Sequence, residues 1–558
     1  MSKKEIVNLL NKYIHLREKE IESLIEIPPS AELGDYAFPC FSLTKKYKKN
    51  PVEIAKKLSE EIKSPLIEKV EAKGPYLNLF INKKVLAEQV IKINANFGKI
   101  NLGKKKKIVI DFSHPNIGKP MHIGHIRSTV IGDSLMRTYR FLGYDPIGIN
   151  YLGDIGLHIG KLIVAYNLWL DKDALKKDPV RELLRLYVEF CAKENTQIKE
   201  GLEEEFQDNE WTNKAKEELK KLELGDKKAH KVWEEIRKAS GKGFDKVYDL
   251  LKVEFTEITG QSKFSEKGKQ IILEALRKQI AKRENDGAIY IEINKQKKYV
   301  LRSNETASYI TQDIGAAVER YKKYKFEKMI YVVDSRQKAH FESLFAILKL
   351  MGYEFTDKMI HLPFGTVRFG NEIMATRQGN IILLEDVLQK TIEKAEEEIK
   401  KRKTKGDAEK VGVGAVKYII LKNEPIKDVQ FSWESALNFE GNAGPYLQYS
   451  YARASSIIKR AKNFNKKTPK ISIVKDEFAL VKKISQFPEI IEHAGAQMNP
   501  SLIANYSFEL AQIFNEFYHS CQVLGSKEEA FRLRLIDAFR TCLKNALYLL
   551  GIEVMEEM

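Results

Sequence analysis

The sequence predicts a multidomain α/β protein: a doubly wound parallel sheet with a small α+β domain before it and an all-α bundle after it. The length of 558 residues favours three to four domains. From Lys106 the chain runs through a buried strand, KKIVIDF, then a loop rich in Pro, Gly and His, then an apolar-periodic helix. This order is the opening of a βαβ unit. After about Lys401 the strand signals nearly vanish, which predicts the helical bundle.

The composition favours a nucleic-acid partner and a reducing compartment. Lysine and arginine number 94 against 77 aspartate and glutamate, and the formal charge of +17 favours nucleic acid ahead of an acidic membrane face. The 43% hydrophobic content excludes a wholly disordered chain. We find no C-x-x-C pair, signal peptide or membrane-spanning run, so we expect a cytoplasmic protein with no zinc, no disulfide framework and no membrane association. The cysteines are Cys40, Cys191, Cys521 and Cys542.

Residues 1–103 form the expected N-terminal domain. Helical spacing of apolar residues runs through EIVNLLNKYIHLREKEIESLI and PVEIAKKLSEEIK, whereas YLNLFIN alternates as a strand does. The domain ends at the polar turn NLGKKKK. A small α+β domain follows from this pattern.

Residues 104–400 form the expected sheet domain, and residues 401–558 the expected bundle. Further candidate strands are IGINYLG, AIYIEI, MIYVVDS and MIHLPFG. Between about residues 171 and 264 the chain becomes densely charged and helical. We interpret this stretch as a helical insertion, because a crossover between parallel strands does not need such length. In the last part, apolar residues recur at three- and four-residue spacing.

The most specific short motif is His122-Ile123-Gly124-His125, placed where the first strand of the sheet leads into its helix. A helix N-terminus presents unpaired N–H groups and the positive end of the helix dipole, which suits a triphosphate. Two imidazoles one turn apart could donate to phosphate and ribose-side oxygens as charge builds in a transition state. Gly124 would let a nucleotide approach the backbone. Two surface histidines in a turn are the alternative interpretation.

A second set of side chains could bind a planar cation. Tyr309 and Asp313 are four residues apart in a helical stretch, so they share one face. An aromatic ring beside a carboxylate forms a pocket that stacks on a guanidinium and pairs with it. Gln337 follows the strand MIYVVD, at the carboxyl edge where doubly wound sheets bind ligands. On these residues alone, a helix cap or a surface ion pair remains possible.

The segment SHPNIGKPMHIGHIRST resembles the signature region of class I aminoacyl-tRNA synthetases, and specifically of arginyl-tRNA synthetases. The resemblance extends over nearly the whole chain, through NYLGDIGLHIGKL, YVLRSNETASYITQDIGAAVER, YVVDSRQKAHFESLFAILKLMGY and GNAGPYLQYSYARASSI. It implies a Rossmann-like catalytic domain, an N-terminal module that reads the outer corner of a tRNA, and a C-terminal anticodon-binding domain. The matching signature residues are Pro115, Asn116, Lys119, His122, His125, Arg127, Ser128 and Thr129.

The resemblance implies ATP-dependent ligation of L-arginine to tRNA(Arg) through an arginyl-adenylate, by an enzyme that we expect to be a monomer. Members of this family generally need bound tRNA before they activate arginine. Mg²⁺ is expected on the phosphates of ATP, and no metal-binding side chain can be assigned. The resemblance implies catalytic roles for His122, His125, Lys119 and Arg377, ATP contacts from these four with Gly124 and Met374, and arginine contacts from Asn116, Tyr309, Asp313 and Gln337.

The chain departs from the class I pattern in the second nucleotide loop. The family's Lys-Met-Ser-Lys-Ser segment corresponds to IMATRQGN, which contains Met374 and Arg377 but neither lysine. Many arginyl enzymes share this departure, and the resemblance assigns the missing charge to Lys119, with Arg377 as the remaining cation in the loop. Two alternatives stay open: a class I ligase for another amino acid or a small thiol or amine, and a catalytically silent RNA-binding paralogue.

Overall fold

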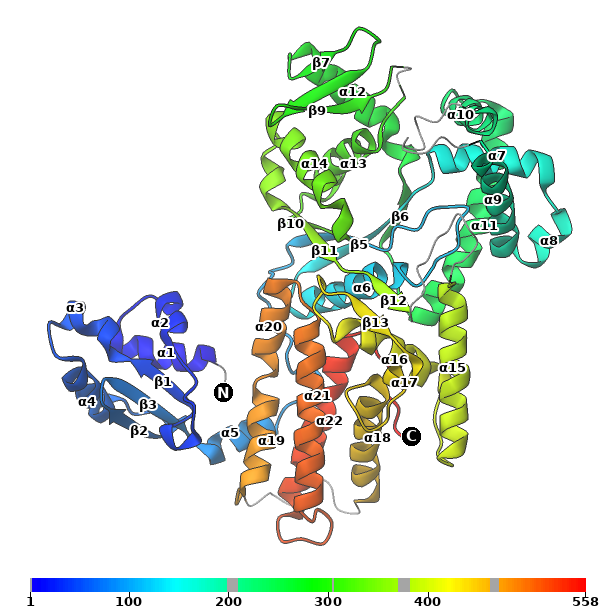
Figure 1. The fold of residues 1–558 in the computed structure, drawn as a ribbon. Helices are drawn as coiled ribbons and strands as arrows, with labels where there is room; N and C mark the ends of the chain where they lie inside the picture. The colour runs from blue at the N-terminus through cyan, green and yellow to red at the C-terminus, as the bar shows by residue number, and fades with distance from the viewer. Residues whose placement is uncertain (1–2, 198–208, 304–305, 370–381, 462–470) are drawn as a thin grey trace.

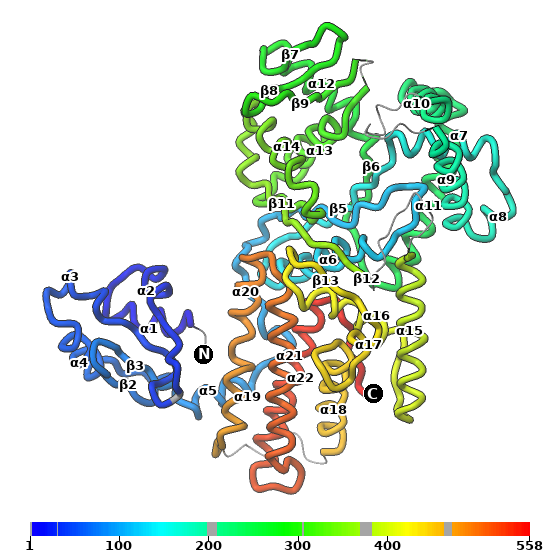
Figure 2. Tube along the Cα trace, in the orientation of Figure 1, coloured from blue at the N-terminus to red at the C-terminus, as the bar shows by residue number. Residues whose placement is uncertain are grey.

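The computed structural model describes residues 3–197, 209–303, 306–369, 382–461 and 471–558. It confirms the predicted fold class. A parallel sheet with helices on both faces lies above a helical bundle, and the N-terminal module stands beside that bundle (Figure 1). The tube in Figure 2 shows the same arrangement, with the helical insertion on the side of the sheet away from the N-terminal module. Within the described residues, no helix is both long and apolar enough to cross a membrane.

The central sheet is entirely parallel, with the strand order β11-β10-β4-β5-β6. The chain enters in the middle at β4, adds β5 and β6 on one side, and later adds β10 and β11 on the other side. The strand order therefore reverses between β4 and β10, and ligands bind at the carboxyl ends of strands at such a point. These strands are β4 (Lys107–Asp111), β5 (Asp145–Leu152), β6 (Glu257–Gly260), β10 (Lys328–Asp334) and β11 (Met359–Phe364).

Side chains of β4 alternate between two hydrophobic cores. Ile108 and Ile110 pack into the core that contains α6 and the bundle, whereas Val109 packs into the core formed with α12, α13 and α14. All three side chains are fully buried, as expected for a strand covered on both faces. The covering helices are α6 (His125–Phe141), α12 (Ser262–Arg277), α13 (Tyr309–Tyr324) and α14 (Lys338–Leu350).

Two strands differ from the sequence-based expectation. The segment AIYIEI belongs not to the parallel sheet but to a separate antiparallel sheet of β7 (Ala281–Arg283), β8 (Ile289–Ile293) and β9 (Gln296–Leu301). The fifth parallel strand is β6, which lies inside the range expected for the helical insertion. It has four residues, and Ile258 is 50% exposed. A short edge strand does not need an apolar run, so it leaves no strong sequence signal.

The inserted helices pack on one another at the side of the sheet. Their centre holds a buried ion pair between Lys161 and Glu194, whose side chains are 1% and 3% exposed. Thr212 donates to the other carboxylate oxygen of Glu194 at 2.8 Å, which satisfies this buried charge. The helices are α7 (Leu157–Trp169), α8 (Lys172–Lys177), α9 (Pro179–Asn195), α10 (Glu210–Glu223) and α11 (Lys227–Leu251).

The N-terminal module is an α+β domain with an antiparallel sheet in the order β1-β3-β2. Asp35 joins it to the bundle, because one carboxylate oxygen accepts from the backbone of Ile81 at 2.9 Å and the other binds Lys482 at 2.7 Å. Its elements are α1 (Lys3–Ile14), α2 (Glu18–Leu24), β1 (Tyr36–Pro39), α3 (Thr44–Tyr47), α4 (Pro51–Glu61), β2 (Ile67–Lys73), β3 (Tyr76–Ile81) and α5 (Lys83–Val90).

Among its described residues, the last part of the chain is helical except for one strand, Val429–Phe431, which pairs in parallel with Val367–Phe369. The bundle helices run roughly side by side below α6 (Figure 1). The elements are β12 (Val367–Phe369), α15 (Leu384–Lys401), α16 (Ala408–Leu421), β13 (Val429–Phe431), α17 (Trp433–Ala436), α18 (Gly444–Arg460), α19 (Lys475–Ser485), α20 (Phe487–Gln497), α21 (Ser501–Ser520) and α22 (Glu529–Leu549).

Helix α6 is held firmly by the bundle. The hydroxyl of Tyr139 donates to the carbonyl of Gly495 at 2.9 Å. Beside α6, the buried ammonium of Lys417 donates to the carbonyl oxygens of Leu251, at the end of α11, and Gly551, beyond α22. Burial removes this ammonium from water and lowers the pKa of Lys417 to about 8. The helix that begins at His125 is therefore fixed to both the insertion and the bundle.

Candidate active site

The loop that joins β4 to α6 lies at the reversal point of the sheet. Its backbone is tied to the end of β5: Ile117 donates to the carbonyl of Gly153, and Gly153 donates to the carbonyl of Pro115, both at 3.1 Å. On the other side of β4, β10 ends at Asp334 and leads directly to Gln337. The loops after β4, β5 and β10 thus meet at one edge of the sheet. Most of the candidate site residues predicted from the sequence lie at this edge.

His122 and His125 form a pair of contacting rings at the N-terminus of α6, with centroids 4.0 Å apart and ring planes tilted by 51°. The backbone N–H of Gly124 donates to Nδ1 of His122, and the backbone N–H of His122 donates to Nδ1 of His125, both at 3.1 Å. A ring nitrogen that accepts carries no proton, so the proton of each neutral ring lies on Nε2. The backbone thereby leaves each ring an Nε2–H donor.

Both rings are neutral at physiological pH. Burial, with the charges of Lys119 and Arg336, lowers the pKa of His122 to about 4. Burial, with the neighbouring His122, lowers the pKa of His125 well below its usual value. Neutral rings keep one acceptor and one donor, as the backbone contacts require.

We expect both rings to stay in the Nε2–H form when the pH is lowered from 7 to 5. Histidines of the unfolded chain titrate near pH 6.5, so below that pH the unfolded state binds more protons and the folded state loses stability as the pH falls. Ring ¹⁵N chemical shifts of histidine-labelled protein, assigned with His122→Gln and His125→Gln, measure the tautomer. A ring that titrates near pH 6.5 contradicts the expectation.

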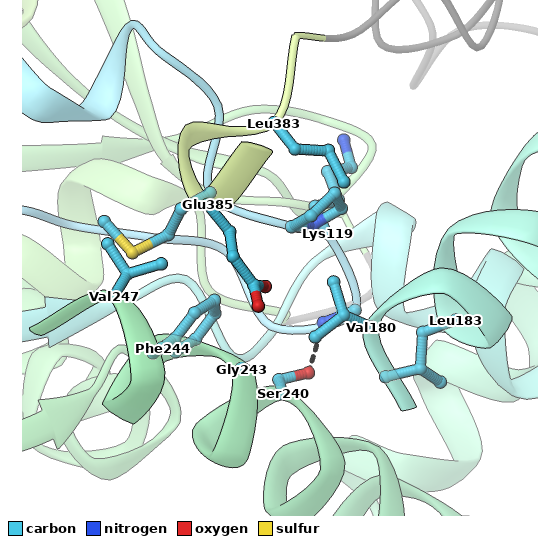
Figure 3. A pocket seen from close by; sticks show the side chains of 12 residues that line it. Lys119, Val180, Leu183, Ser240, Gly243, Phe244, Val247, Leu383 and Glu385 are labelled. Carbon is cyan, nitrogen blue, oxygen red and sulfur yellow. Dashed lines mark hydrogen bonds between the residues drawn. The ribbon is translucent and has the colours of Figure 1, made fainter. Parts of the chain in front are cut away.

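Lys119 lines a small pocket between this loop and the helical insertion (Figure 3). Its ammonium is 4.5 Å from the ring centroid of Tyr187 on α9, and its charge contributes to the lowered pKa of His122. The preceding residue, Gly118, donates through its backbone to the hydroxyl of Ser240 on α11 at 2.7 Å. The insertion therefore positions the lysine beside the histidine pair.

The residues expected to hold a guanidinium come from the loop after β4, from the start of α13 and from the segment after β10. Asn116 lies against Gly153, where a Cβ would be 1.9 Å from its side-chain oxygen. Tyr309, at the start of α13, lies beside Gly156, where a Cβ would be 2.8 Å from the phenol oxygen. Both glycines belong to the loop after β5, so this loop lies between Asn116 and Tyr309. Gln337 is exposed at the N-terminus of α14.

Asp313 contacts a histidine that the sequence reasoning did not single out. Nε2 of His340, in the first turn of α14, lies 2.6 Å from Oδ2 of Asp313, and the two side chains are 28% and 16% exposed. Burial opposes the charge on His340, but the hydrogen bond and charge of Asp313 outweigh it and raise the pKa of His340. The only signal in the sequence was the position of this histidine three residues after Gln337.

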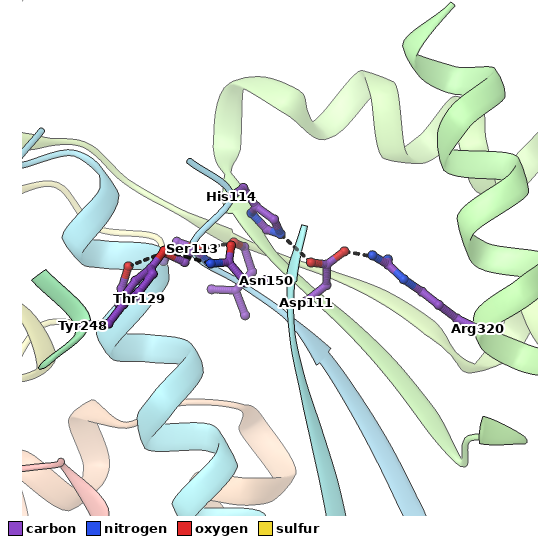
Figure 4. Close-up of polar contacts among 9 residues, drawn as sticks. Asp111, Ser113, His114, Thr129, Asn150, Tyr248 and Arg320 are labelled. Carbon is purple, nitrogen blue, oxygen red and sulfur yellow. Dashed lines mark hydrogen bonds and ion pairs between the residues drawn. The ribbon is translucent and has the colours of Figure 1, made fainter. Parts of the chain in front are cut away.

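A buried network of charged side chains connects the end of β4 to α13 next to the site (Figure 4). Asp111, the last residue of β4, accepts from Arg320 at 2.6 Å and contacts Nε2 of His114 at 2.8 Å. Burial disfavours the charged carboxylate, but Arg320 and His114 outweigh this effect and lower the pKa of Asp111. Arg320 lies on α13, seven residues after Asp313, so the helix that carries Asp313 is fixed to the central strand.

Family comparisons cover almost the entire chain. Residues 88–433 match the family described as tRNA synthetases class I (R), catalytic domain. Residues 2–81 match the arginyl tRNA synthetase N terminal domain, and residues 447–558 match the DALR anticodon binding domain.

The chain belongs to the arginyl-tRNA synthetase family.

Individual relatives of this family are similar over their full length. An arginine–tRNA ligase of Clostridium botulinum (strain Alaska E43 / Type E3) is 39% identical over 572 residues, covering 100% of both chains. One of Halothermothrix orenii is 42% identical over 574 residues, covering 100% of this chain and 99% of the relative. The solved Thermus thermophilus arginyl-tRNA synthetase shares the fold, with a TM-score of 0.81 over 100% of both chains at 24% identity.

Within this arginyl-tRNA synthetase, the signature residues after His125 have contacts that build the fold. The hydroxyl of Ser128 accepts from the backbone of Ser113 at 2.8 Å and donates to the carbonyl of Val332 at 2.7 Å. It thus joins the ends of β4 and β10. Arg127 is fully buried and donates to the carbonyl oxygens of Glu424 and Pro425.

The second nucleotide loop of this synthetase, with Met374 and Arg377, lies outside the described residues. The residues that follow it are anchored on the histidine motif. Ile123 donates to the carbonyl of Ile382 at 3.2 Å, and Leu384 donates to the carbonyl of Met121 at 2.9 Å. Among the residues that the structure describes, no group of three or more His, Cys, Asp or Glu side chains could hold a metal ion.

Proposed function

We propose that this arginyl-tRNA synthetase ligates L-arginine to tRNA(Arg) at the expense of ATP, through an arginyl-adenylate. The observation that carries the proposal is the combination, at one sheet edge, of a neutral histidine pair at a helix N-terminus and a carboxylate, Asp313, one helical turn after Tyr309. The first suits a nucleotide triphosphate and the second suits a guanidinium. The full-length similarity to arginine–tRNA ligases supports the same activity.

The histidine pair would stabilise the transition state of the first step. The arginine carboxylate attacks the α-phosphate of ATP, the bond to the β-phosphate oxygen breaks, and pyrophosphate leaves. Nε2–H groups of His122 and His125 would donate to the phosphate oxygens on which charge builds, and Gly124 would leave room for the nucleotide. Because both rings are neutral and held through Nδ1, they need no rearrangement to donate.

Cations would complete the nucleotide site. Lys119 would stabilise the charge on the phosphates, in the role that the lysines of the second loop have in other class I enzymes. From that loop, Arg377 would add a second positive charge and Met374 would add a contact to ATP. Mg²⁺, carried on the phosphate oxygens of ATP, would neutralise charge on the leaving pyrophosphate.

Residues from α13 and from the segments after β4 and β10 would bind the substrate side chain. Asp313 would pair with the guanidinium, Tyr309 would stack on it, and Asn116 and Gln337 would hold the amino acid in register with the α-phosphate. Planar, charge-assisted recognition of this kind distinguishes arginine from lysine. The arginyl group would then pass to the 2′-hydroxyl of the terminal adenosine of the tRNA.

The remaining domains would bind the tRNA. The bundle would bind the anticodon, and the N-terminal module would bind the outer corner of the tRNA. The Asp35–Lys482 ion pair would set the distance between these two domains. Residues 1–103, 104–400 and 401–558 would be the three domains. We propose that the enzyme works as a monomer in the cytoplasm.

A charging assay on the purified full chain tests the proposed function. With ATP, Mg²⁺ and total tRNA, we expect charging with arginine and none above background with lysine, glutamine or cysteine. Pyrophosphate exchange is expected only when tRNA is present. Preference for another amino acid would show a different class I ligase, and tRNA binding without charging would show a silent RNA-binding paralogue.

A further inference from the structure

The carboxylate proposed to bind the substrate guanidinium is already engaged. Oδ2 of Asp313 lies 2.6 Å from Nε2 of His340. The pair reaches the solvent, because the side chains are 16% and 28% exposed. A guanidinium that approaches Asp313 therefore meets a histidine in contact with the same carboxylate.

The surroundings of His340 favour a positive charge only through Asp313. His340 lies in the first turn of α14, where the positive end of the helix dipole disfavours an imidazolium. Its neighbours on the other side are aromatic: the ring of Phe341 packs edge-on at a centroid distance of 5.4 Å. Asp313 is the group whose hydrogen bond and charge raise the pKa of His340. An imidazolium at this position depends on that carboxylate.

Three described titratable groups near the pair stay neutral near neutral pH. Burial raises the pKa of Tyr151 on β5 and of Tyr331 on β10, so both phenols stay neutral. Burial lowers the pKa of His361 on β11, which is a neighbour of His340. The carboxylates around His361, on β10 and α14, are Asp334 and Glu342.

We propose that His340 binds Asp313 as an imidazolium before the substrate arrives, and that it releases its proton to solvent when the guanidinium of arginine pairs with Asp313. This inference rests on the proposed function, because it takes arginine as the ligand of Asp313. With the guanidinium in place, an imidazolium would be a second cation in contact with one carboxylate. A neutral ring can still donate Nε2–H to Oδ2 while the guanidinium binds Oδ1.

His340 would thus be a residue that positions Asp313 and determines the specificity for a charged substrate side chain. A permanently charged guanidinium can replace the imidazolium charge, whereas a neutral side chain of similar shape cannot. Below the pKa of His340 the dissociation constant of arginine should rise about tenfold for each pH unit, because one proton must leave for each arginine bound. Above that pKa the constant should be independent of pH.

The number of protons released tests this directly. Arginine binding to the full chain is followed by isothermal titration calorimetry at pH 6 and pH 8, each in two buffers that differ in ionisation enthalpy. We expect release of about one proton per arginine at pH 6 and less at pH 8, because a smaller fraction of His340 carries the proton at the higher pH. Release that is absent at pH 6 overturns the proposal, and this measurement requires no variant.

Two glutamine variants assign the proton. His340→Gln keeps an amide donor near the position of Nε2 but cannot titrate. Proton release at pH 6 should therefore fall to near zero, and the dissociation constant of arginine should lose its tenfold rise per pH unit. His361→Gln is the matched control and should release protons as the wild type does. Release that persists in His340→Gln, or that disappears in His361→Gln, assigns the proton elsewhere and overturns the proposal.

The outcomes separate this inference from the proposed function. If arginine binds and is charged to tRNA without proton release, His340 is a neutral structural partner and the proposed function stands. If arginine neither binds nor is charged, both the proposed function and the role of His340 are wrong.

Discussion

Replacing Asp313 by alanine is expected to lower kcat/KM for arginine by roughly 30- to 5,000-fold. Removing one partner of a largely desolvated charge pair costs about 2–5 kcal/mol, and each 1.4 kcal/mol is a factor of ten. The side chain of Asp313 is 16% exposed, so water can only partly replace it. The KM for ATP should change little, because the nucleotide site lies on the histidine loop. Charging of tRNA at varied arginine and ATP concentrations measures both values.

Two further variants sharpen this result. Asp313→Asn keeps the shape and one acceptor but loses the charge, so its defect should lie between those of the wild type and the alanine variant. Asp357→Ala, at a carboxylate that is 78% exposed and paired with Lys349, is the control and should charge normally. An arginine kcat/KM within threefold of the wild type in Asp313→Ala would mean that the guanidinium binds elsewhere.

Removal of the Nε2–H donor of His125 is expected to lower kcat by about 10²–10³, the usual effect of losing one donor to a developing oxyanion. The structure allows the two ring nitrogens to be tested separately. Asparagine places an acceptor near Nδ1, which could keep the contact with the backbone of His122, whereas glutamine places a donor near Nε2. His125→Gln should therefore retain more activity than His125→Asn or His125→Ala. Single-turnover charging measures the chemical step.

Controls for this experiment lie in the same chain. Arginine binding should survive in all three His125 variants, since Asp313 lies on α13 and not on α6. His230, 49% exposed on the insertion, gives the matched control His230→Ala with unchanged rates. Charging that continues unchanged in His125→Ala would remove this histidine from the proposed site.

The sequence predicted those features whose causes are local. The strand Lys107–Asp111 contains the apolar run Ile108–Ile110, and the histidine motif follows soon after it, so both could be located from the residues alone. Edge strand β6 could not, because its four residues bury little and their pairing with β5 is decided by the sheet. The segment AIYIEI shows the reverse error: its strand pattern was correct, but the pattern contains no information on which sheet it joins.

The residues of the candidate site could be proposed from the sequence, but the contacts between them could not. Tyr309 and Asp313 were proposed from residue type and spacing, and Gln337 from its place at the carboxyl edge of the sheet. The partner of Asp313 was not, since His340 approaches it from another helix at a distance of 27 positions along the chain. The same holds for the pairing of Asp111 with Arg320, which are 209 positions apart. Contacts of this kind depend on the strand order, which no local pattern contains.

The attachment of α6 to the bundle bears on how the protein is made. Asp133, within this helix, lies near the ammonium of Lys417, which in turn binds the carbonyl of Gly551, almost at the end of the chain. At roughly 5–20 residues per second of synthesis, Gly551 follows Asp133 by on the order of tens of seconds. During that time the apolar face of α6 has no bundle to cover it. The nascent chain therefore makes the histidine motif and α6 early, but completes the support beneath this helix only after Gly551 has been added.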